Sequence, residues 1–310
     1  MSAARPAPAP TRDGLGARAT LDCRGRPLDV RPGRGVVMGV LNVTPDSFSD
    51  GGRYGTVQAA RDRAGEMAEA GAAIVDVGGE STRPGADPVG LDEELDRVVP
   101  VVEAVVRDLP HLLVSVDTTK GAVARAALRA GAHLVNDVAG TRAGAGTAAA
   151  AAEYGAPLVV MHALEVTGGA APPGTYGDVV GDVAEALDRA ARRAEGLGVR
   201  DVVVDPGFGF GKTVEDNLRL VAGLDRIAAF GRPVLVGVSR KSTVGAVLAG
   251  LRSGGAGRPV PVGERLYGSL GLAALAVVRG AAIVRTHDVR ATAEALAALT
   301  AALDAGGADL

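Results

Sequence analysis

Eight short runs rich in Val, Ile and Leu recur along the chain, and each is followed by a segment with helical character. Several runs are apolar on both of their alternating faces, which is typical of parallel strands that helices cover. Eight such strand–helix units in 310 residues predict one closed (β/α)8 barrel. The runs occupy residues 36–42, 72–79, 112–117, 133–138, 157–162, 202–207, 233–239 and 281–288.

Three segments between the runs carry clear helix signals. Residues 57–71 have apolar side chains at helical spacing before a Gly stop, and residues 178–198 are Ala-rich and also end in Gly. Residues 91–108 interleave charge with Val, and Pro100 predicts a kink or a break there. A doubly wound open sheet is the structural alternative, but its usual G-x-G-x-x-G signature does not follow the first strand.

The predicted barrel domain covers residues 20–305 and follows a tail over residues 1–19. Residues 20–30 hold two short apolar pieces around a Gly/Pro turn, which predicts a hairpin that caps the bottom of the barrel. The tail is rich in Ala, Pro and Arg and lacks the apolar run of a signal peptide. It faintly resembles an organelle transit peptide, but a disordered tail is the favoured interpretation.

Composition narrows the classes of function. The 33 basic and 36 acidic residues are intermixed, for a net charge of −3, and no basic stripe predicts a nucleic-acid partner. No stretch approaches the ~18 continuous apolar residues of a membrane span. The single cysteine, Cys23, excludes an internal disulfide and favours a cytoplasmic location.

Nearly every predicted strand ends in polar or ionisable residues. In a barrel the carboxyl ends of the strands converge on one mouth, so these side chains are expected to meet there. One Asp at a strand end is often only a helix cap, but desolvating many polar groups is costly unless they meet a ligand or one another. The residues concerned are Asn42, Asp117, Asn136, Asp137, Met161, His162, Asp205, Ser239, Arg240, Lys241, Arg285 and His287, with the segment 78–86.

These residues sort into two chemical groups. Asp117, Asn136 and Asp205 are short acceptors that suit a flat heterocycle with an N–H and amino edge, such as a pterin or a guanine-like ring. The second group consists of donors that suit a phosphate or diphosphate, namely Arg83, Lys241, Arg285 and His287. Asn42 offers a neutral oxygen to Mg²⁺ bound mainly by water and phosphate oxygens. These residues therefore predict two adjoining pockets at the mouth, one for a heterocycle and one for a phosphorylated leaving group.

The motif DPGFGFGKT at 205–213 does not match the phosphate-loop pattern G-x-x-x-x-G-K-[ST]. Its glycines predict a tight turn that a ligand can approach closely. Three of the four Phe residues, Phe48, Phe208 and Phe210, lie in this motif or in the motif after the first strand. They predict a wall for planar ligands, with anchoring of the loops as the alternative, which is favoured for Phe208.

Two further motifs are ambiguous when each is taken alone. VSRKST at 238–243 leaves a strand and enters a helix, where backbone N–H groups with Ser239 and Lys241 could hold an anion, or simply form a basic loop. In RTHD at 285–288, Arg285 and His287 point the same way on an extended strand, although a lone His is more often structural.

Taken together and in order, the motifs closely resemble dihydropteroate synthase over roughly residues 20–305. They are MGVLNVTPDSFSDGG, VDVGGESTRPGA, SVDT, NDVAG, VVMH, DPGFGFGKT, VGVSRKS and RTHDV. The resemblance implies a homodimeric barrel enzyme, a transferase that joins 6-hydroxymethyl-7,8-dihydropterin diphosphate to p-aminobenzoate with Mg²⁺. The products implied are 7,8-dihydropteroate and diphosphate, in folate biosynthesis, and sulfonamides mimic the aminobenzoate.

The resemblance also implies roles for the matching residues. Those of the pterin pocket are Asp117, Asn136, Met161, Asp205 and Lys241. Those of the diphosphate and Mg²⁺ site are Asn42, Arg285 and His287. Those of the aminobenzoate pocket are Phe48, Pro84, Phe210 and Ser239. Thr82 matches a substrate contact in the second loop, beside Arg83. The residues expected to carry catalysis are Lys241, Asp117, Asp205 and Arg83.

The mechanism implied is dissociative: diphosphate leaves first, the bound pterin stabilises a methylene cation, and the amine then attacks. The first two loops would close and exclude water from the cation. Thr286 and Thr243 depart from the family pattern, which has small and bulky apolar residues there, and neither change removes a functional group. Thr243 is expected to alter packing near the aminobenzoate pocket.

Two rivals share the barrel. A pterin-binding methyltransferase that serves a corrinoid protein has no need of SRKS and RTHD for diphosphate. A non-catalytic binding or structural paralogue would be favoured by loss of Arg83, Lys241 or His287, and all three are present.

Overall fold

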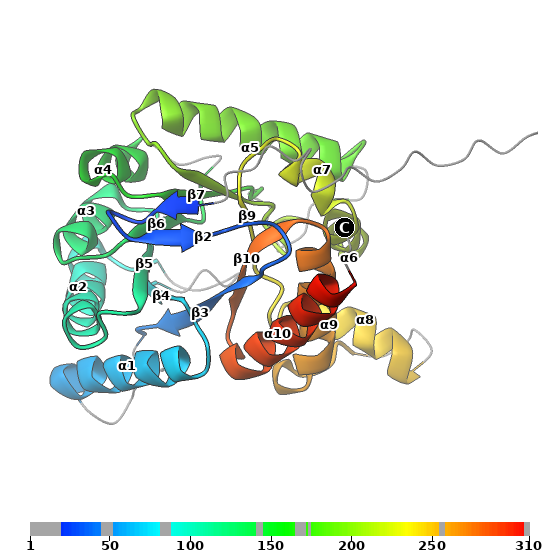
Figure 1. Cartoon of the computed structure of the whole chain (residues 1–310), viewed down its shortest axis with the longest axis horizontal. Coiled ribbons are helices and arrows are strands. Elements are labelled where there is room, and N and C mark those ends of the chain that lie inside the picture. Colours follow the sequence, from blue (N-terminus) through cyan, green and yellow to red (C-terminus); the bar gives the residue numbers. More distant parts are fainter. Residues whose placement is uncertain are drawn as a thin grey trace, which may run out of the picture.

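The computed structural model describes residues 20–44, 52–80, 88–140, 145–164, 172, 175–253 and 258–306. Within them, eight parallel strands form a closed barrel in the order β10-β3-β4-β5-β6-β7-β8-β9 (Figure 1). Each predicted run contains one strand, and β10 pairs with β3 to close the sheet, which excludes the open alternative. The strands are β3 (Val36–Asn42), β4 (Ile74–Gly78), β5 (Leu113–Asp117), β6 (Leu134–Asp137), β7 (Leu158–Met161), β8 (Val202–Asp205), β9 (Val234–Val236) and β10 (Ala281–Thr286).

Helices surround the barrel and cover the outer face of its sheet (Figure 1). They are α1 (Gly52–Glu69), α2 (Leu91–Asp108), α3 (Gly121–Arg129), α4 (Gly146–Tyr154), α5 (Val179–Gly196), α6 (Val214–Ala222), α7 (Leu224–Ala228), α8 (Ser242–Ser253), α9 (Leu266–Val278) and α10 (Val289–Ala305), with the 3₁₀ turn η3 (Val262–Glu264). Within the described residues, no helix has both the length and the apolar character needed to cross a membrane.

Helix α2 continues through Pro100, so of the kink or break predicted there, the break is wrong. Proline removes one backbone hydrogen bond and costs about 3 kcal/mol in a helix interior. Val98, Val101, Val102 and Val105 are fully buried on one face of α2, which packs against β4 and β5. Burial of each such side chain stabilises by roughly 1.5–3 kcal/mol, which outweighs the loss at the proline.

The inside of the barrel is filled by side chains from the first part of each strand. This inner cluster contains Met38, Ile74, Leu113, Leu134, Val159, Val203, Leu235, Ala282 and Ile283, packed with Leu21, Cys23, Leu28 and Val30 from below. Because side chains alternate along a strand, the inward positions after Ile74 and Leu113 are Asp76 and Ser115, and then Gly78 and Asp117. An apolar lower layer thus supports a polar upper layer.

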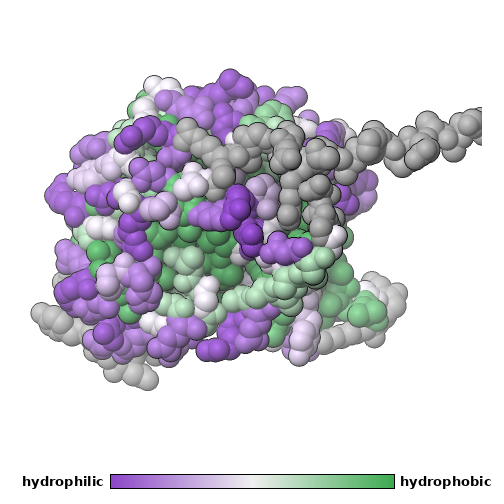
Figure 2. All heavy atoms as spheres, viewed as in Figure 1, coloured by the Kyte–Doolittle hydropathy of each residue, from purple (hydrophilic) through white to green (hydrophobic). Residues whose placement is uncertain are grey.

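A hairpin of β1 (Thr20–Asp22) and β2 (Pro27–Asp29) closes the lower end, as predicted. Its strands are antiparallel, and the pair Leu21 and Leu28 belongs to the inner cluster. Arg24 in its turn donates hydrogen bonds to the carbonyls of Leu128 (2.8 Å) and Ala132 (2.6 Å). Figure 2 shows this face, with apolar side chains at its centre and polar ones around them.

The buried His133 beside the hairpin predicts that the folded state loses stability in acid. Its Nδ1 accepts a hydrogen bond from the Val114 N–H (3.0 Å), and Arg26 Nη1 lies 3.3 Å from Nε2. Burial, with the charges of Arg26 and Arg24, lowers the pKa of His133 from 6.5 to about 4. The unfolded chain therefore binds this proton at a higher pH than the folded chain, and protonation between these values favours unfolding.

We expect the free energy of unfolding to be largest above pH 6.5 and to fall as the pH drops towards 4, by up to about 3 kcal/mol. Urea titrations across this range should show the loss in the native chain and a flatter profile in His133→Asn, whose amide oxygen can still accept from Val114. Parallel profiles for the two proteins would contradict the assignment to His133.

Candidate functional site at the barrel mouth

The register of the strands brings the predicted strand-end residues to one rim. Asn42 pairs with Gly78, Gly78 with Asp117, and Asp117 with Asn136, across four neighbouring strands. Met161 and Asp205 are likewise paired at the ends of β7 and β8. The upper layer of the barrel is therefore lined by amide and carboxylate groups that are far apart in the sequence.

Arg285 connects this layer from β10. Its Nε donates to Asp76 Oδ2 (2.6 Å) and its Nη2 donates to Asp117 Oδ2 (2.7 Å). Asn136 Nδ2 donates to the same oxygen of Asp76 (2.9 Å). Asp76 is completely buried, and its Oδ1 has no hydrogen-bond partner in the part of the chain that the structure describes. Four strands thus contribute to one buried polar network.

This network shifts the proton affinities of its members. Burial raises the pKa of Asp117 to about 7; Arg285 opposes the shift, and Asp76 adds to it by repulsion. Burial alone would lower the pKa of Arg285, but Asp76 and Asp117 outweigh it and raise that pKa instead. Arg285 therefore stays charged, and its ion pair with Asp117 opposes the protonation that burial of this carboxylate favours.

The loop after β8 is shaped by a glycine that no other residue could replace without a shift of the backbone. Gly207 has a φ of +67°, and a Cβ there would lie 1.8 Å from the His162 carbonyl oxygen. Its N–H donates to Asp205 Oδ1 (2.7 Å), which fixes that carboxylate. The buried Lys212 Nζ donates to the carbonyls of His162 (3.2 Å), Gly207 (3.0 Å) and Phe210 (3.1 Å). The tight turn predicted from the motif is thus held by an internal lysine.

Lys241, which follows β9, reaches across to this loop. Its Nζ donates to the Phe208 carbonyl and lies 4.4 Å from the centroid of the Phe210 ring. Burial lowers the pKa of Lys241 to about 8, against the attraction of Asp205, and Arg285 lowers it further. Burial likewise raises the pKa of Asp205, with Lys241 opposing. Phe208 is fully buried in the core, whereas Phe210 is half-buried beside the lysine.

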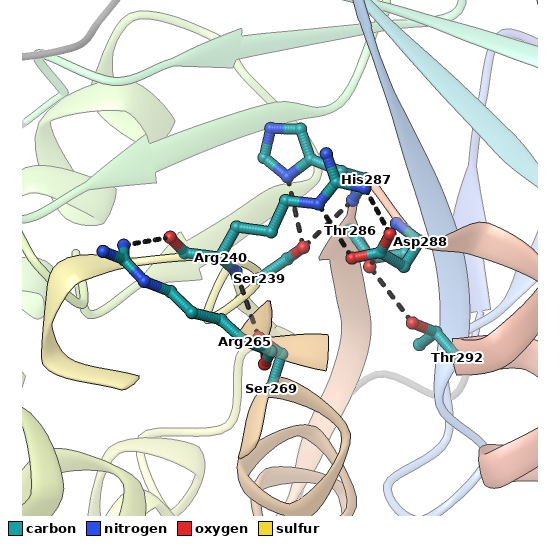
Figure 3. A network of polar contacts seen from close by, with 8 residues as sticks. All are labelled: Ser239, Arg240, Arg265, Ser269, Thr286, His287, Asp288 and Thr292. Atoms are coloured by element: carbon teal, nitrogen blue, oxygen red, sulfur yellow. Dashed lines mark hydrogen bonds and ion pairs between the residues drawn. The ribbon is translucent and has the colours of Figure 1, made fainter. Parts of the chain in front are cut away.

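Ser239 and His287 meet beyond the ends of β9 and β10. The His287 backbone N–H donates to Ser239 Oγ (3.2 Å), and His287 Nδ1 lies 3.1 Å from the same oxygen (Figure 3). The side chain of Arg285 points instead toward Asp76 and Asp117. The two residues of the RTHD motif therefore contact different neighbours.

The two positions that depart from the family pattern are both buried and hydrogen-bonded. Thr286 Oγ1 lies 3.1 Å from Thr292 Oγ1 and accepts from the Asp288 N–H (3.1 Å). Thr243 Oγ1 accepts from Asn217 Nδ2 (3.0 Å). Each hydroxyl thus takes a polar role in place of an apolar side chain.

Four predicted site residues, Phe48, Thr82, Arg83 and Pro84, lie outside the described residues. Conversely, sequence reasoning missed three buried polar residues, Asp76, Lys212 and Asn217. Asn217 accepts from the Gly209 N–H (2.7 Å) and so links the loop after β8 to Thr243. Asp76 had a signal, because it is a charged residue within an apolar run and two positions before a strand end.

Comparisons with known proteins agree on one family. The model of the family described as pterin binding enzyme matches residues 38–287. The dihydropteroate synthase of Streptococcus pyogenes is 44% identical over 270 residues, covering 86% of this chain and 96% of that protein. That of Escherichia coli is 43% identical over 271 residues, covering 87% and 92%. The chain belongs to the dihydropteroate synthase family. Members of this family are transferases of folate biosynthesis, so the chain is an enzyme of that class.

Solved structures of the family share the fold. Dihydropteroate synthase from Xanthomonas albilineans with 4-aminobenzoic acid has a TM-score of 0.80 and 44% identity, covering 92% of this chain and 98% of that one. The Thermus thermophilus enzyme in complex with 6HMPPP has a TM-score of 0.75 and 44% identity, covering 91% and 99%. The Yersinia pestis enzyme, in a sulfonamide drug complex, has a TM-score of 0.81 and 41% identity, covering 92% and 99%.

Proposed function

We propose that this protein condenses 6-hydroxymethyl-7,8-dihydropterin diphosphate with p-aminobenzoate to give 7,8-dihydropteroate and diphosphate. The observation that carries the proposal is the composition of the mouth, where Asp117, Asn136 and Asp205 adjoin Arg285 and Lys241. Acceptors for a flat ring thus lie beside cations for a departing anion. Relatives solved with 4-aminobenzoic acid and with 6HMPPP support the same substrates.

In this proposal the pterin ring binds in the upper layer of the barrel. The carboxylates of Asp117 and Asp205 accept hydrogen bonds from its N–H and amino groups, and Asn136 contributes an amide. The nearly fully buried Met161 packs against the ring, and Lys241 lies at the pocket's edge beside Phe210. Since the carboxylates are desolvated, a ring that donates to them replaces lost water contacts.

We propose a dissociative reaction. The C–O bond to diphosphate breaks first, and the bonding electron pair leaves with the diphosphate. Arg285, His287 and Lys241 stabilise the developing negative charge, because fixed donors in a desolvated site need no reorganisation. The negative charge of Asp117 and Asp205 stabilises the cation on the pterin methylene carbon. The amine of p-aminobenzoate then forms the new C–N bond and loses a proton.

We propose Mg²⁺ as the metal of this reaction, with Asn42 as its ligand from the protein. Within the described residues no three His, Cys, Asp or Glu side chains gather into a metal site. Asn42 is half-buried at the end of β3 and supplies one neutral oxygen. This donor set fits only an ion held mainly by water and diphosphate oxygens, as Mg²⁺ commonly is. When bound, the ion would neutralise charge on the leaving group.

The aminobenzoate is proposed to bind beside Lys241 and Phe210, at the turn that also carries Ser239. Phe210 offers a ring face, and Ser239 stands at the turn that leads into α8. We propose that Phe48 and Pro84 complete this pocket from the first two loops, that Thr82 contacts substrate from the second loop, and that Arg83 beside it is a catalytic cation.

The test is direct. Purified protein, the pterin diphosphate, p-aminobenzoate and Mg²⁺ should yield dihydropteroate, detected by liquid chromatography, and diphosphate in equal amount. Absence of product, with a folded protein and both substrates intact, would overturn the proposal. Transfer of a methyl group to a corrinoid protein in the same preparation would establish the methyltransferase rival instead.

We also propose that the protein is a cytoplasmic homodimer that binds small molecules and no nucleic acid. Five exposed apolar side chains belong to the consecutive elements α8, η3 and α9, namely Val247, Leu251, Val262, Tyr267 and Leu275. Leu251 and Tyr267 are 83% and 82% exposed, which suits a face covered by a second copy.

Sedimentation equilibrium should give a dimer for the native chain and a monomer for the double variant Leu251→Arg with Tyr267→Arg. Phe230→Arg is the matched control, because it places the same charge on an exposed apolar residue elsewhere, after α7. A monomeric native chain, or a dimer that survives the double variant, would refute this interface.

A further inference from the structure

Arg240 adopts an unusual backbone conformation between two proposed site residues, Ser239 and Lys241. Its φ is +61°, and among the described residues Arg24 is the only other non-glycine residue with a positive φ. A residue with a Cβ pays a steric cost in this region, so surrounding contacts must hold it there.

Helix α9 and the residue before it supply those contacts. The Arg240 N–H donates to Ser269 Oγ (3.1 Å), and Arg265 Nη1 donates to the Arg240 carbonyl (2.8 Å) (Figure 3). Ser269 Oγ in turn donates to the Arg265 carbonyl (2.8 Å), and Arg265 Nε donates to the Val260 carbonyl (2.7 Å). Both polar groups of the Arg240 backbone are therefore bound.

The Arg240 side chain makes a third attachment, to the segment after β10. Its Nε donates to Asp288 Oδ2 (3.0 Å), and its Nη2 pairs with Oδ1 of the same carboxylate. The backbone N–H of Asp288 donates to Thr286 Oγ1, and this bond holds the backbone of the residue that carries the carboxylate. Figure 3 shows this pair beside the contact between Ser239 and His287, so two ties join the turn after β9 to the end of β10.

We propose that Arg240 and Asp288 are positioning residues that hold the turn with Ser239 and Lys241 in register with the segment that carries Arg285 and His287. This inference rests on the proposed function. There, the turn with Ser239 and Lys241 serves the pterin and aminobenzoate, and the segment with Arg285 and His287 serves the diphosphate. A bidentate arginine–carboxylate pair fixes orientation as well as distance. When the pair is lost, the strained peptide at Arg240 relaxes and Lys241 moves from Phe208 and Asp205.

The first experiment measures activity. Asp288→Asn and Arg240→Gln should each lower kcat/KM for dihydropteroate formation about 10-fold or more, the loss expected for one charge-assisted hydrogen bond. The double variant should lose no more than either single variant, because both remove one interaction. Arg232→Gln is the control. Arg232 makes a similar forked pair with Glu195, but it precedes β9 at the opposite end of the barrel.

The second experiment follows Lys241 itself and does not require turnover. The chain has three lysines, Lys120, Lys212 and Lys241, so ¹³C-lysine spectra are readily assigned. We expect the Lys241 pKa to rise from about 8 toward 10.5 in Asp288→Asn and to stay near 8 in Arg232→Gln.

These two readouts separate the possible failures. A native chain that makes no dihydropteroate refutes the proposed function, and the titration of Lys241 still decides whether the pair positions it. An active native chain whose Asp288→Asn variant keeps kcat/KM within twofold and an unshifted Lys241 pKa overturns the inference alone. A reduced thermal stability with both readouts unchanged would show a merely structural pair and would overturn it as well.

Discussion

Lys241→Ala and Asp205→Asn are each expected to lower kcat for dihydropteroate formation by ~10²-fold or more. Lys241 is desolvated beside Phe208 and Phe210, and the Asp205 carboxylate is fixed by the Gly207 N–H. Loss of one such preorganised group costs about 10²–10³ in rate when charge develops next to it. Steady-state kinetics with both substrates saturating will measure the effect.

Asp29→Asn serves as the control for the loss of a carboxylate. Asp29 pairs with Arg31 on the exposed hairpin, at the opposite end of the barrel, so turnover should be unchanged. Circular dichroism would establish that all three variants are folded. Near-native rates in both site variants would refute the roles assigned to Lys241 and Asp205.

Asp76→Ala is expected to lower the free energy of unfolding by about 3 kcal/mol, since it removes one partner from a buried ion pair. Arg285 would keep only Asp117, and the Asn136 amide would lose its acceptor. Urea unfolding monitored by circular dichroism, with linear extrapolation to water, gives the difference.

Asp188→Ala is the matched control for Asp76→Ala. Asp188 also binds an arginine that has a second carboxylate partner, because Arg232 contacts both Asp188 and Glu195. The Asp188 carboxylate is 16% exposed, whereas that of Asp76 is completely buried, so we expect a smaller loss from Asp188→Ala. Equal losses in the two variants would mean that complete burial of Asp76 adds nothing to the cost of losing a carboxylate partner.

The barrel was predictable because its strands carry the strongest local signal in the sequence. Several runs are apolar on both faces, and all eight contain a strand, although the run at 72–79 begins two residues before β4 (Ile74–Gly78). The run at 233–239 likewise contains the three residues of β9, and the rest forms the turn with Ser239. The bounds of the predicted runs and of the strands differ because strand ends depend on backbone pairing, which side-chain patterns do not encode.

The mouth was predictable only in part. Residues at strand ends, such as Asp117 and Asn136, could be grouped because barrel geometry brings all strand ends together. Asp76 lies one inward position lower, within a run that reads as apolar, and its role depends on Arg285 from a distant strand. The contacts that hold the Arg240 backbone could not be predicted from the sequence either, because they depend on the packing of α9 against the turn after β9.

The way the barrel is closed has a consequence for its synthesis on the ribosome. The hairpin of β1 and β2 emerges first, yet it packs on an inner cluster that includes Leu235 and Ile283. Strand β3 likewise needs β10, so the two ends of the domain remain without partners until nearly the whole chain has been translated. We therefore expect nascent chains that end before Ala281 to be protease-sensitive, and resistance to arise in one late step as the last strand is released.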